Sequence, residues 1–354
     1  MSDLVVQSHQ GPYEAHFSSE PLETLFKQAP AGAHFIIDEE VALLHAEPLR
    51  LVLASQSVLK LKASERAKTL VEFTHYIEHL VGRGVRRGDM LVAIGGGVIQ
   101  DITCFLAATL LRGLEWQFYP TTLLAQADSC IGSKSSINVG SAKNILGTYT
   151  PPKRIVINMR FLETLPEQDL RSGIGEMLKV HAIEGPESFD RIARDYPRLM
   201  SDRALLLLYL RQALEIKRRI IEVDEFDRGP RNVMNYGHSF GHAIESATQY
   251  AIPHGIAVTL GMDMANFTAW RLGLSAEAIY RRMRPTLAAN YSGYERTPVP
   301  LDQFLAAIGK DKKNTKDQLG LILPDTDGHL AKRLCPNNEQ FREACAEYLS
   351  EKRG

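Results

Sequence analysis

Three histidines in the second half of the chain have the residue type and the spacing of metal ligands. His238 and His242 are four residues apart, so on a helix they lie on one face, one turn apart. His254 follows Pro253 and precedes an apolar run, which predicts that it lies in the first turn of a further helix. Imidazole is the commonest protein ligand of divalent transition metals. We therefore expect a metal site, although a histidine pair at this spacing alone more often lies on a surface or in a capped core.

A carboxylate that could join these histidines lies earlier in the chain. Glu176 and Lys179 are three residues apart and share one face of a predicted helix. Glu176 is the candidate carboxylate ligand for a metal that His238 and His254 also bind. A simple ion pair within the helix is the alternative interpretation.

Gly95-Gly96-Gly97 is a glycine turn between an apolar strand at 91–94 and an apolar helix at 102–111. This context suits a phosphate-binding loop, because glycines let the backbone approach a pyrophosphate and a helix N-terminus supplies free N–H groups. The turn matches neither of the common nucleotide-binding fingerprints, and a tight turn without a ligand is the alternative. Asp38, at the end of an earlier strand, could hold a ribose hydroxyl or simply cap the helix that follows it.

The segment 120–138, with Lys143 and Asn144 shortly after it, mixes small, hydroxylic and charged residues. A solvated loop would carry more charge, whereas a core segment would not contain Asp128, Lys134 or Asn138. Because buried polar groups without partners are unfavourable, a polar ligand is their expected partner.

Further cations lie beside the histidine region or after it. Arg231 precedes His238 by seven residues, so both lie on about the same side if the helix begins that early. Lys217 is a second candidate, with a charged and solvated helix face as its alternative. Lys312 belongs to a late basic cluster that by itself indicates a solvated loop.

Length and composition set the class of protein. A chain of 354 residues is long for one core, so two domains are expected. Lys and Arg number 41 against 42 for Asp and Glu, which gives no electrostatic argument for binding nucleic acid or a membrane surface. Four cysteines without a CxxC pair fit a reducing compartment. With no signal-peptide pattern and no apolar run near the ~18 residues of a membrane span, a cytoplasmic protein is expected.

The pattern of elements divides the chain in two. Short apolar runs at 33–38, 50–54 and 89–94 predict strands of a parallel sheet, with a charged helical stretch at 64–83 between them. From about residue 164 the pattern is almost wholly helical, including a strong apolar helix at 205–214. We place an α/β domain at 1–165 and a helical domain at 166–354.

Seven segments together resemble the 3-dehydroquinate synthase family, a branch of the sugar-phosphate cyclases. They occur in order and with matching spacing over about residues 34–325, and their ranges are 95–101, 120–138, 143–144, 175–179, 235–245, 254–255 and 311–313. The resemblance implies a Rossmann-like domain that binds NAD, an all-α C-terminal domain, and one zinc or cobalt ion in the cleft. It also implies a homodimer in which Arg112 reaches the neighbouring subunit's site.

The resemblance assigns a role to each matching residue. The metal ligands would be Glu176, His238 and His254, which moves His242 from the metal to the phosphate group or to a proton relay. The NAD-binding residues would be Asp38, Glu65, Lys68, Gly95, Gly96, Gly97, Val98, Ile99, Gln100, Asp101, Thr121, Thr122 and Lys143. The substrate's carboxylate would be bound by Lys217 and Arg231, its phosphate by Lys134, Asn144, His242 and Lys312, and its hydroxyls by Asp128, Lys179 and Asn235. Lys179, Asp128, Asn235 and His242 would be the catalytic residues.

The activity that the resemblance implies is the NAD- and metal-dependent cyclisation of a sugar phosphate with loss of phosphate. Retention of Lys217 and Arg231 favours 3-deoxy-arabino-heptulosonate 7-phosphate as substrate and 3-dehydroquinate as product. The alternatives are a cyclase for another phosphorylated ketose such as sedoheptulose 7-phosphate, a metal-dependent polyol dehydrogenase of similar fold, and an inactive scaffold that still binds NAD or metal.

Several positions depart from the family's pattern. Gln100 and Ser133 stand where glycine is usual, Cys104 stands where glycine is frequent, and Ser64 replaces the glycine of the GExxK element. The motif before Glu176 reads GIGE in place of GLAE. These changes indicate a divergent branch, and we expect Gln100 to alter the contacts with NAD.

Overall fold

The computed structural model describes residues 3–27, 30–140, 142–310, 314–315 and 318–352. The chain divides into two compact units, residues 1–166 with 217–226 and residues 167–216 with 227–354. A single boundary between residues 165 and 166 does not account for 217–226. These residues begin within the continuous helix α8 (Arg203–Val223), and a continuous helix gives no sign in the sequence that its end joins another unit.

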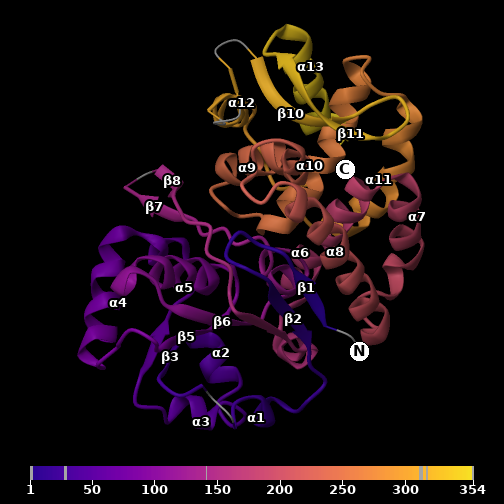
Figure 1. Ribbon diagram of the computed structural model, residues 1–354. Helices are drawn as coiled ribbons and strands as arrows, with labels where there is room; N and C mark the ends of the chain where they lie inside the picture. Colours follow the sequence, from indigo (N-terminus) through magenta and orange to yellow (C-terminus); the bar gives the residue numbers. More distant parts are fainter. Residues whose placement is uncertain (1–2, 28–29, 141, 311–313, 316–317, 353–354) are drawn as a thin grey trace. The chain divides into compact units, whose positions relative to one another are not determined.

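A seven-stranded sheet forms the centre of the first unit, in the order β1-β2-β9-β6-β5-β3-β4 (Figure 1). All neighbouring strands are parallel except β1 and β2, which are antiparallel. The strands are β1 (Leu4–Val6), β2 (Tyr13–Phe17), β3 (Ala33–Asp38), β4 (Val58–Leu61), β5 (Met90–Gly95), β6 (Glu115–Pro120) and β9 (Arg154–Ile157). The expected parallel α/β sheet is confirmed, with an antiparallel strand added at one edge.

Helices cover both faces of this sheet, with α1–α3 on one side and α4 and α5 on the other (Figure 1). Phe35 and Ile37 of β3 pack with Val92 and Ile94 of β5 in the core under the first group. Their neighbours in sequence point to the second group, because successive strand residues alternate between faces. The helices of this unit are α1 (Leu22–Leu25), α2 (Glu39–Leu44), α3 (Arg50–Leu53), η1 (Glu65–Lys68), α4 (Leu70–Gly82), α5 (Gly97–Thr109), η2 (Leu110–Arg112), η3 (Ala125–Ser129) and η4 (Met159–Thr164).

One sequence-based assignment in this unit is wrong. The run 50–54, expected as a strand, contains helix α3, in which Val52 is buried and Leu51 is exposed. So short an apolar run does not distinguish a strand from a helical turn by its periodicity. The stretch 64–83 is helical as expected, and it consists of the short 3₁₀ helix η1 followed by α4.

The register of the central strands brings the expected cofactor residues to one edge of the sheet. Ile94 pairs with Tyr119 and Gly95 pairs with Pro120, so β5 and β6 end level with each other. β3 ends beside them, since its Ile37 also pairs with Ile94. The carboxyl edge of a parallel sheet is where such folds bind ligands.

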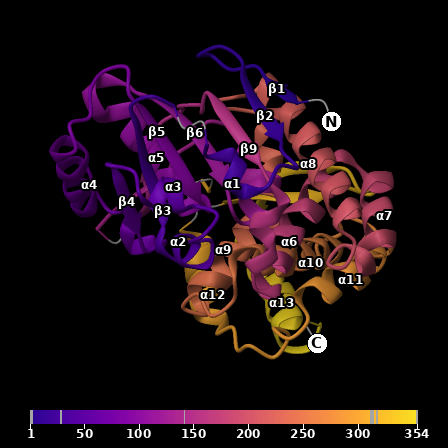
Figure 2. The ribbon, with the colours of Figure 1, turned by 90° about the horizontal axis from the view of Figure 1, so that it is seen from below.

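The second unit is built around α10, which is buried from Gly255 to Ala269. A helix buried on all sides is the core of its domain. It packs against α9, α11 and α6, and Figure 2 shows α6, α9 and α10 side by side. The helices are α6 (Glu167–Glu184), α7 (Pro186–Asp195), η5 (Tyr196–Arg198), α8 up to residue 216, η6 (Pro230–Asn235), α9 (His238–Ala247), α10 (His254–Arg271), α11 (Glu277–Tyr291), α12 (Leu301–Gly309), α13 (Glu339–Glu347) and η7 (Tyr348–Lys352).

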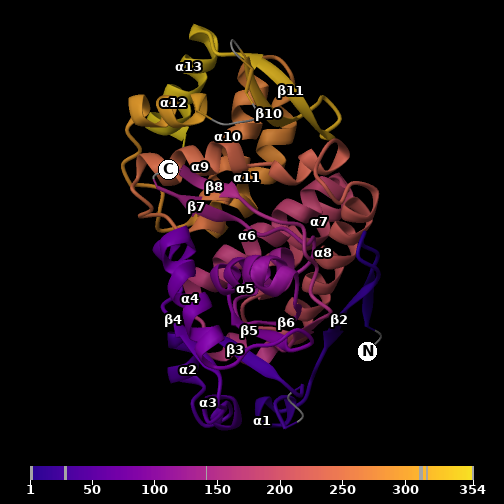
Figure 3. The ribbon, with the colours of Figure 1, turned by 60° about the vertical axis from the view of Figure 1, so that its left-hand side comes forward.

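The second unit is helical as expected but not all-α. Strands β10 (Gln318–Pro324) and β11 (Leu330–Pro336) form an antiparallel hairpin, visible beside α13 in Figure 3. Gly328 adopts a φ of 88° in the connecting turn, and Asp325 accepts hydrogen bonds from the backbone N–H groups of Asp327 and His329. The sequence Asp-x-Asp-Gly between two extended runs therefore predicts a β-hairpin.

Among the described residues, no helix is both long enough and apolar enough to cross a membrane. The four cysteines are buried and carry free thiols. Burial raises the pKa of Cys104 and of Cys130 to about 12 each, so both thiols stay protonated and poorly reactive. The cytoplasmic location stays a prediction.

Candidate active site

Three helices of the second unit carry the expected metal ligands. Glu176 lies on α6, His238 begins α9 and His254 begins α10, directly after a proline as predicted. α6 and α10 approach each other closely beside these residues, because a Cβ atom on Gly175 would stand only 2.3 Å from the carbonyl oxygen of Gly255. Glycine is required at this crossing, and it brings the adjacent Glu176 and His254 side chains together.

The carboxylate of Glu176 and two imidazoles converge. Oε1 of Glu176 lies 3.7 Å from Nε2 of His238 and 3.4 Å from Nε2 of His254. Ligands held tetrahedrally about 2.0–2.1 Å from zinc lie about 3.3 Å from one another. The same Oε1 is buried and has no hydrogen-bond partner among the described residues. A divalent metal ion fits this group of donors.

His242 lies beside the same group. One ligand atom from each of His238, His242 and His254 lies within 4.8 Å of the others. The ring of His242 is centred 5.3 Å from that of His238 and 5.6 Å from that of His254. By distance alone the three histidines therefore form a second possible ligand set, but His242 is exposed, so water can satisfy its ring nitrogens.

Hydrogen bonds orient the rings of His238 and His254. Nδ1 of His238 donates to the carbonyl oxygen of Tyr236 at 3.2 Å, and Nδ1 of His254 donates to the carboxylate of Glu245 at 3.2 and 3.3 Å. With the proton on Nδ1, the lone pair of each Nε2 faces Glu176. Glu245 was given no role from the sequence. Its spacing could have indicated a role, because Glu245 lies two helical turns after His238, on the same helix face as His238 and His242.

Charge gathers around this site. Lys179 Nζ lies 2.6 Å from Oε2 of Glu176, and the two side chains are 2% and 1% exposed. Burial raises the pKa of Glu176, but Lys179 and His254 outweigh it and hold that pKa well below its usual range. Burial lowers the pKa of His254, but its contacts with Glu176 and Glu245 outweigh burial and raise the pKa to about 10. Two carboxylates around one imidazole favour a cation at this point.

Two further residues lie in η6, just before α9. The condition under which Arg231 and His238 would share a helix side is not met, because Gly237 has a left-handed φ of 75° and α9 begins only after it. Arg231 is nevertheless 95% buried, since only 5% of its surface is exposed. Asn235 donates a hydrogen bond from Nδ2 to the carbonyl oxygen of Asn232 at 3.1 Å.

The glycine turn of the first unit has the predicted form. β5 ends at Gly95, Gly96 precedes the helix, and α5 begins at Gly97. A Cβ atom on Gly96 would stand 3.0 Å from Cγ2 of Thr122, so the turn packs tightly on the segment that follows β6. The first N–H groups of α5, on Gly97, Val98 and Ile99, lack helical partners and can bind an anion. Thr121 continues from Pro120 by donating its N–H to the carbonyl of Gly95 at 3.0 Å.

The side chain of Gln100 contacts Ser129, which lies beside the glycine turn, because a Cβ atom on Gly97 would stand 3.8 Å from Ser129 Oγ. Nε2 of Gln100 donates to the carbonyl oxygen of Ser129 at 2.6 Å, and its Oε1 accepts from the hydroxyl of Ser129 at 2.6 Å. Gln100 is buried. The side chain that replaces a glycine of the family therefore fastens α5 to η3, next to Asp128.

We expect Gln100→Ala to lower the free energy of unfolding by about 2 kcal/mol, because two partly buried hydrogen bonds of about 1 kcal/mol each are lost. A urea titration followed by circular dichroism measures this change. Gln10→Ala is the control, since Gln10 is exposed and makes only a 3.5 Å contact with Tyr149. An unfolding free energy equal to that of the control would contradict the role of the Gln100 bonds.

A polar cluster connects several expected cofactor residues. Lys68 Nζ forms an ion pair with Oδ2 of Asp101 at 2.8 Å and contacts Oε1 of Glu65 at 3.5 Å and Oδ1 of Asn144 at 3.3 Å. Asn138 donates to Glu65 at 2.9 Å. Burial raises the pKa of Asp101 to about 6, even though the Lys68 ion pair lowers it. The structure thus brings together Glu65, Lys68 and Asp101, and adds Asn144, which was expected at the phosphate.

Asp38 and Lys143 lie less deeply. Asp38 caps α2 by accepting from the N–H of Glu40 at 3.1 Å, which is the alternative left open from the sequence. Lys143 is exposed on β8 (Ala142–Leu146), the partner of β7 (Ile137–Val139), and it helps to lower the pKa of Glu65.

Asp128 and Lys217 form a buried ion pair within the first unit. Lys217 Nζ lies 2.6 Å from Oδ1 of Asp128 and also donates to its backbone carbonyl. The side chain of Lys217 is 8% exposed and that of Asp128 is 14% exposed. A solvated helix face is therefore not the surrounding of Lys217, although the residue lies on the charged helix α8.

The remaining expected substrate residues differ in their surroundings. Lys134 is half-buried, with its ammonium 6.0 Å from the ring centre of Tyr149. Arg112 is exposed at the end of η2 and has a left-handed φ of 69°. Lys312 lies outside the described residues.

Comparison with known proteins identifies the family and the fold. A model of the 3-dehydroquinate synthase N-terminal region matches residues 58–172, and a model of its C-terminal region matches residues 173–314. A 3-dehydroquinate synthase from Cereibacter sphaeroides is 37% identical over 299 residues, 81% of each chain.

Two solved structures share the fold over almost the whole chain. A 2-epi-5-epi-valiolone synthase from Streptomyces hygroscopicus, with NAD⁺ and Zn²⁺ bound, is 28% identical with a TM-score of 0.82 and covers 96% of this chain and 97% of its own. A 2-deoxy-scyllo-inosose synthase in complex with carbaglucose-6-phosphate, NAD⁺ and Co²⁺ has the same TM-score at 23% identity, covering 99% and 100%, which establishes the fold alone. Because both halves of the chain match consecutive models and a relative is 37% identical across most of it, this protein belongs to the 3-dehydroquinate synthase family of sugar-phosphate cyclases.

Proposed function

We propose that the protein converts 3-deoxy-arabino-heptulosonate 7-phosphate to 3-dehydroquinate and inorganic phosphate. The observation that carries the proposal is the convergence of Glu176 Oε1 with His238 Nε2 and His254 Nε2, in a family of cyclases. The substrate is inferred from Lys217 and Arg231, two largely buried cations that suit a carboxylate.

The cofactors are inferred to be NAD and one zinc or cobalt ion. Glu176, His238 and His254 would hold the metal, and three protein ligands leave positions open for substrate oxygens. The NAD pyrophosphate would lie at the N-terminus of α5, over Gly96 and Gly97. When bound, NAD takes up and returns a hydride and the metal acts as a Lewis acid on the hydroxyl group being oxidised.

The protein's own residues bind and orient the substrate. Lys179, Asp128 and Asn235 would bind its hydroxyls, and the ion pair with Glu176 keeps Lys179 charged and in place. His242, Lys134, Asn144 and Lys312 would bind the phosphate, where cations stabilise the negative charge of the departing group. We also infer a homodimer in which Arg112 reaches the partner's site.

The proposal predicts phosphate release without net reduction of NAD. Purified protein loaded with zinc and NAD is incubated with 3-deoxy-arabino-heptulosonate 7-phosphate, and phosphate and absorbance at 340 nm are followed together. One phosphate should appear for each carbocyclic product while NADH does not accumulate, since the hydride returns to the substrate. Steady NADH accumulation with a polyol would instead identify a dehydrogenase.

A second candidate substrate is sedoheptulose 7-phosphate, which lacks the carboxylate. The 28% identity to a 2-epi-5-epi-valiolone synthase over most of the chain and the replaced glycines at Gln100, Cys104 and Ser133 favour testing it. A higher kcat/KM for sedoheptulose 7-phosphate, with the product identified by mass spectrometry, would replace the first substrate with this one. No turnover of either, with NAD and metal still bound, would indicate an inactive scaffold.

A further inference from the structure

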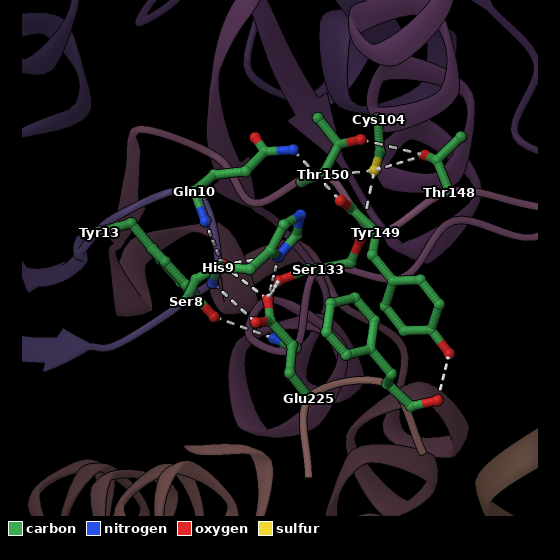
Figure 4. A network of polar contacts seen from close by, with 12 residues as sticks. Ser8, His9, Gln10, Tyr13, Cys104, Ser133, Thr148, Tyr149, Thr150 and Glu225 are labelled. Atoms are coloured by element: carbon green, nitrogen blue, oxygen red, sulfur yellow. Dashed lines mark hydrogen bonds and ion pairs between the residues drawn. The ribbon is translucent and has the colours of Figure 1, made fainter. Parts of the chain in front are cut away.

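Ser133 has an unusual backbone conformation and a specific partner. Its φ is 64°, in the left-handed region that non-glycine residues rarely adopt. Its side chain is buried and donates from Oγ to Oε1 of Glu225 at 2.9 Å (Figure 4). A strained conformation persists only where the surroundings hold it, so the Glu225 contact is a reason for Ser133 to remain in this state.

Glu225 is itself held by the N-terminal segment of the same unit. The Ser8 hydroxyl donates to Oε1 at 2.6 Å, and the His9 backbone N–H donates to Oε2 at 2.8 Å. The ring Nδ1 of His9 lies 3.1 Å from Oε1. Burial raises the pKa of Glu225, but these donors and Ser133 lower it below its usual value, so the carboxylate is charged near neutral pH. Figure 4 shows Ser8, His9 and Ser133 gathered around it.

Backbone hydrogen bonds connect residues 133 and 135 to the segment 148–150. The N–H of Thr150 donates to the carbonyl of Ser133 at 2.7 Å, and the N–H of Ser135 donates to the carbonyl of Thr148 at 3.0 Å. Cys104 Sγ lies 3.3 Å from the carbonyl of Thr150 (Figure 4). The backbone of the residue between Ser133 and Ser135 is therefore fixed by a hydrogen bond on each side.

That residue is Lys134, and its surroundings lead back to Glu225. The Lys134 ammonium lies 6.0 Å from the ring centre of Tyr149, within the range of a cation–π contact. Tyr149 donates its hydroxyl to the carbonyl oxygen of Phe226 at 2.8 Å, and Phe226 directly follows Glu225. The segment 225–226 thus supports Lys134 both through Ser133 and through Tyr149.

We propose that Glu225 is a positioning residue, which holds Ser133 and thereby aims the Lys134 ammonium at the substrate's phosphate. The inference rests on the proposed function, which assigns Lys134 to that phosphate. A lysine side chain has many rotamers, and a fixed backbone and a neighbouring ring reduce the entropy lost when it binds an anion. Glu225 itself touches no substrate in this scheme.

The chain offers a matched control for Glu225. Glu222 lies three residues earlier on α8, and its Oε1 accepts from the N–H of Gln7 at 2.9 Å. Glu222→Gln therefore weakens a contact to the same N-terminal segment without altering the contact to Ser133. Ser133→Ala removes the hydrogen bond between Ser133 and Glu225, and Glu225→Gln weakens it by removing the charge of the acceptor, while both keep the approximate shape.

We expect Glu225→Gln and Ser133→Ala each to raise KM for the sugar phosphate about tenfold, the effect of losing one charge-assisted hydrogen bond, with kcat within about twofold of wild type. Glu222→Gln should leave both constants unchanged. The double variant Ser133→Ala/Glu225→Gln should be no worse than Ser133→Ala alone, because both changes act on one connection. Unchanged KM in both single variants, or an equal rise in Glu222→Gln, overturns the proposal.

A second readout needs no turnover. Hydrogen exchange of the free protein should be faster at Ser135 and Thr150 in Glu225→Gln and Ser133→Ala, but not in Glu222→Gln, and the affinity for inorganic phosphate should fall about tenfold. If the wild type does not release phosphate from the proposed substrate while these changes occur, the proposed function fails and the positioning role stands. If exchange and phosphate affinity are unchanged in Ser133→Ala, the positioning role fails even where Glu225→Gln does not fold.

Discussion

Glu176→Gln is expected to lose both the metal and the activity, whereas His242→Asn is expected to keep the metal and lose activity only. Glutamine has the same shape but no charge, and it leaves Lys179 and the metal without the buried carboxylate between them. We expect metal content below about a tenth of an ion per chain and a fall in kcat of at least about a thousandfold. This exceeds the ten- to hundredfold typical of residues that only orient ligands.

The His242→Asn variant tests which three side chains bind the metal. His242 is exposed, while Oε1 of Glu176 is buried with no hydrogen-bond partner among the described residues. We therefore expect full metal content in His242→Asn and a fall in kcat of about a hundredfold, as for the loss of a proton-transferring side chain. Metal content is measured by inductively coupled plasma mass spectrometry. Metal loss in His242→Asn with metal retained in Glu176→Gln would establish the three-histidine set instead.

Arg231→Met is expected to raise KM for 3-deoxy-arabino-heptulosonate 7-phosphate about a hundredfold. Hydrogen bonds between a guanidinium and a carboxylate contribute roughly 1.5–3 kcal/mol each, and about 2.7 kcal/mol corresponds to a hundredfold change. Methionine keeps the apolar volume at this buried position, so the protein should still fold. The measurement is a steady-state phosphate-release assay.

Two controls separate carboxylate recognition from general damage. Inhibition by inorganic phosphate should be unchanged in Arg231→Met, because the phosphate is assigned to other residues. Arg228→Met, three residues earlier and exposed, should leave KM unaltered. If Arg231→Met leaves KM within about threefold of wild type, Arg231 does not bind the carboxylate and the case for this substrate over sedoheptulose 7-phosphate is lost.

The tertiary contacts give the replaced glycines a physical explanation. Gln100 bonds to Ser129, Cys104 packs against Thr150 and Ser133 bonds to Glu225. These side chains connect α5, the segment 129–133 and residue 225 to one another. Glycines at the same positions have no side chains and could not form these contacts. These contacts lie in and beside the segment that carries Asp128 and Lys134, and the effect of Gln100 on NAD contacts stays a prediction.

Local signals in the sequence were sufficient for the elements that carry the chemistry. A glycine turn between an apolar strand and an apolar helix predicted β5, Gly96 and α5, because that order of residue types permits little else. Pro253 predicted the start of α10 at His254, since proline suits the first turn of a helix. The residues alone offered Glu176 as a candidate ligand with an ion pair as the alternative, the family resemblance favoured the ligand, and the comparisons confirm the family.

Contacts between distant residues decided the rest. No helix joins Arg231 to His238, because α9 begins only after Gly237. The run at 50–54, expected as a strand, contains α3, because burial by neighbouring elements overrides a short local pattern. The sequence by itself determined which residue types could bind a metal, a phosphate and NAD, since those depend on donor atoms. Only the tertiary structure decided that Glu245 orients His254 and that Glu225 holds Ser133, because a hydrogen bond depends on distances between residues far apart in the chain.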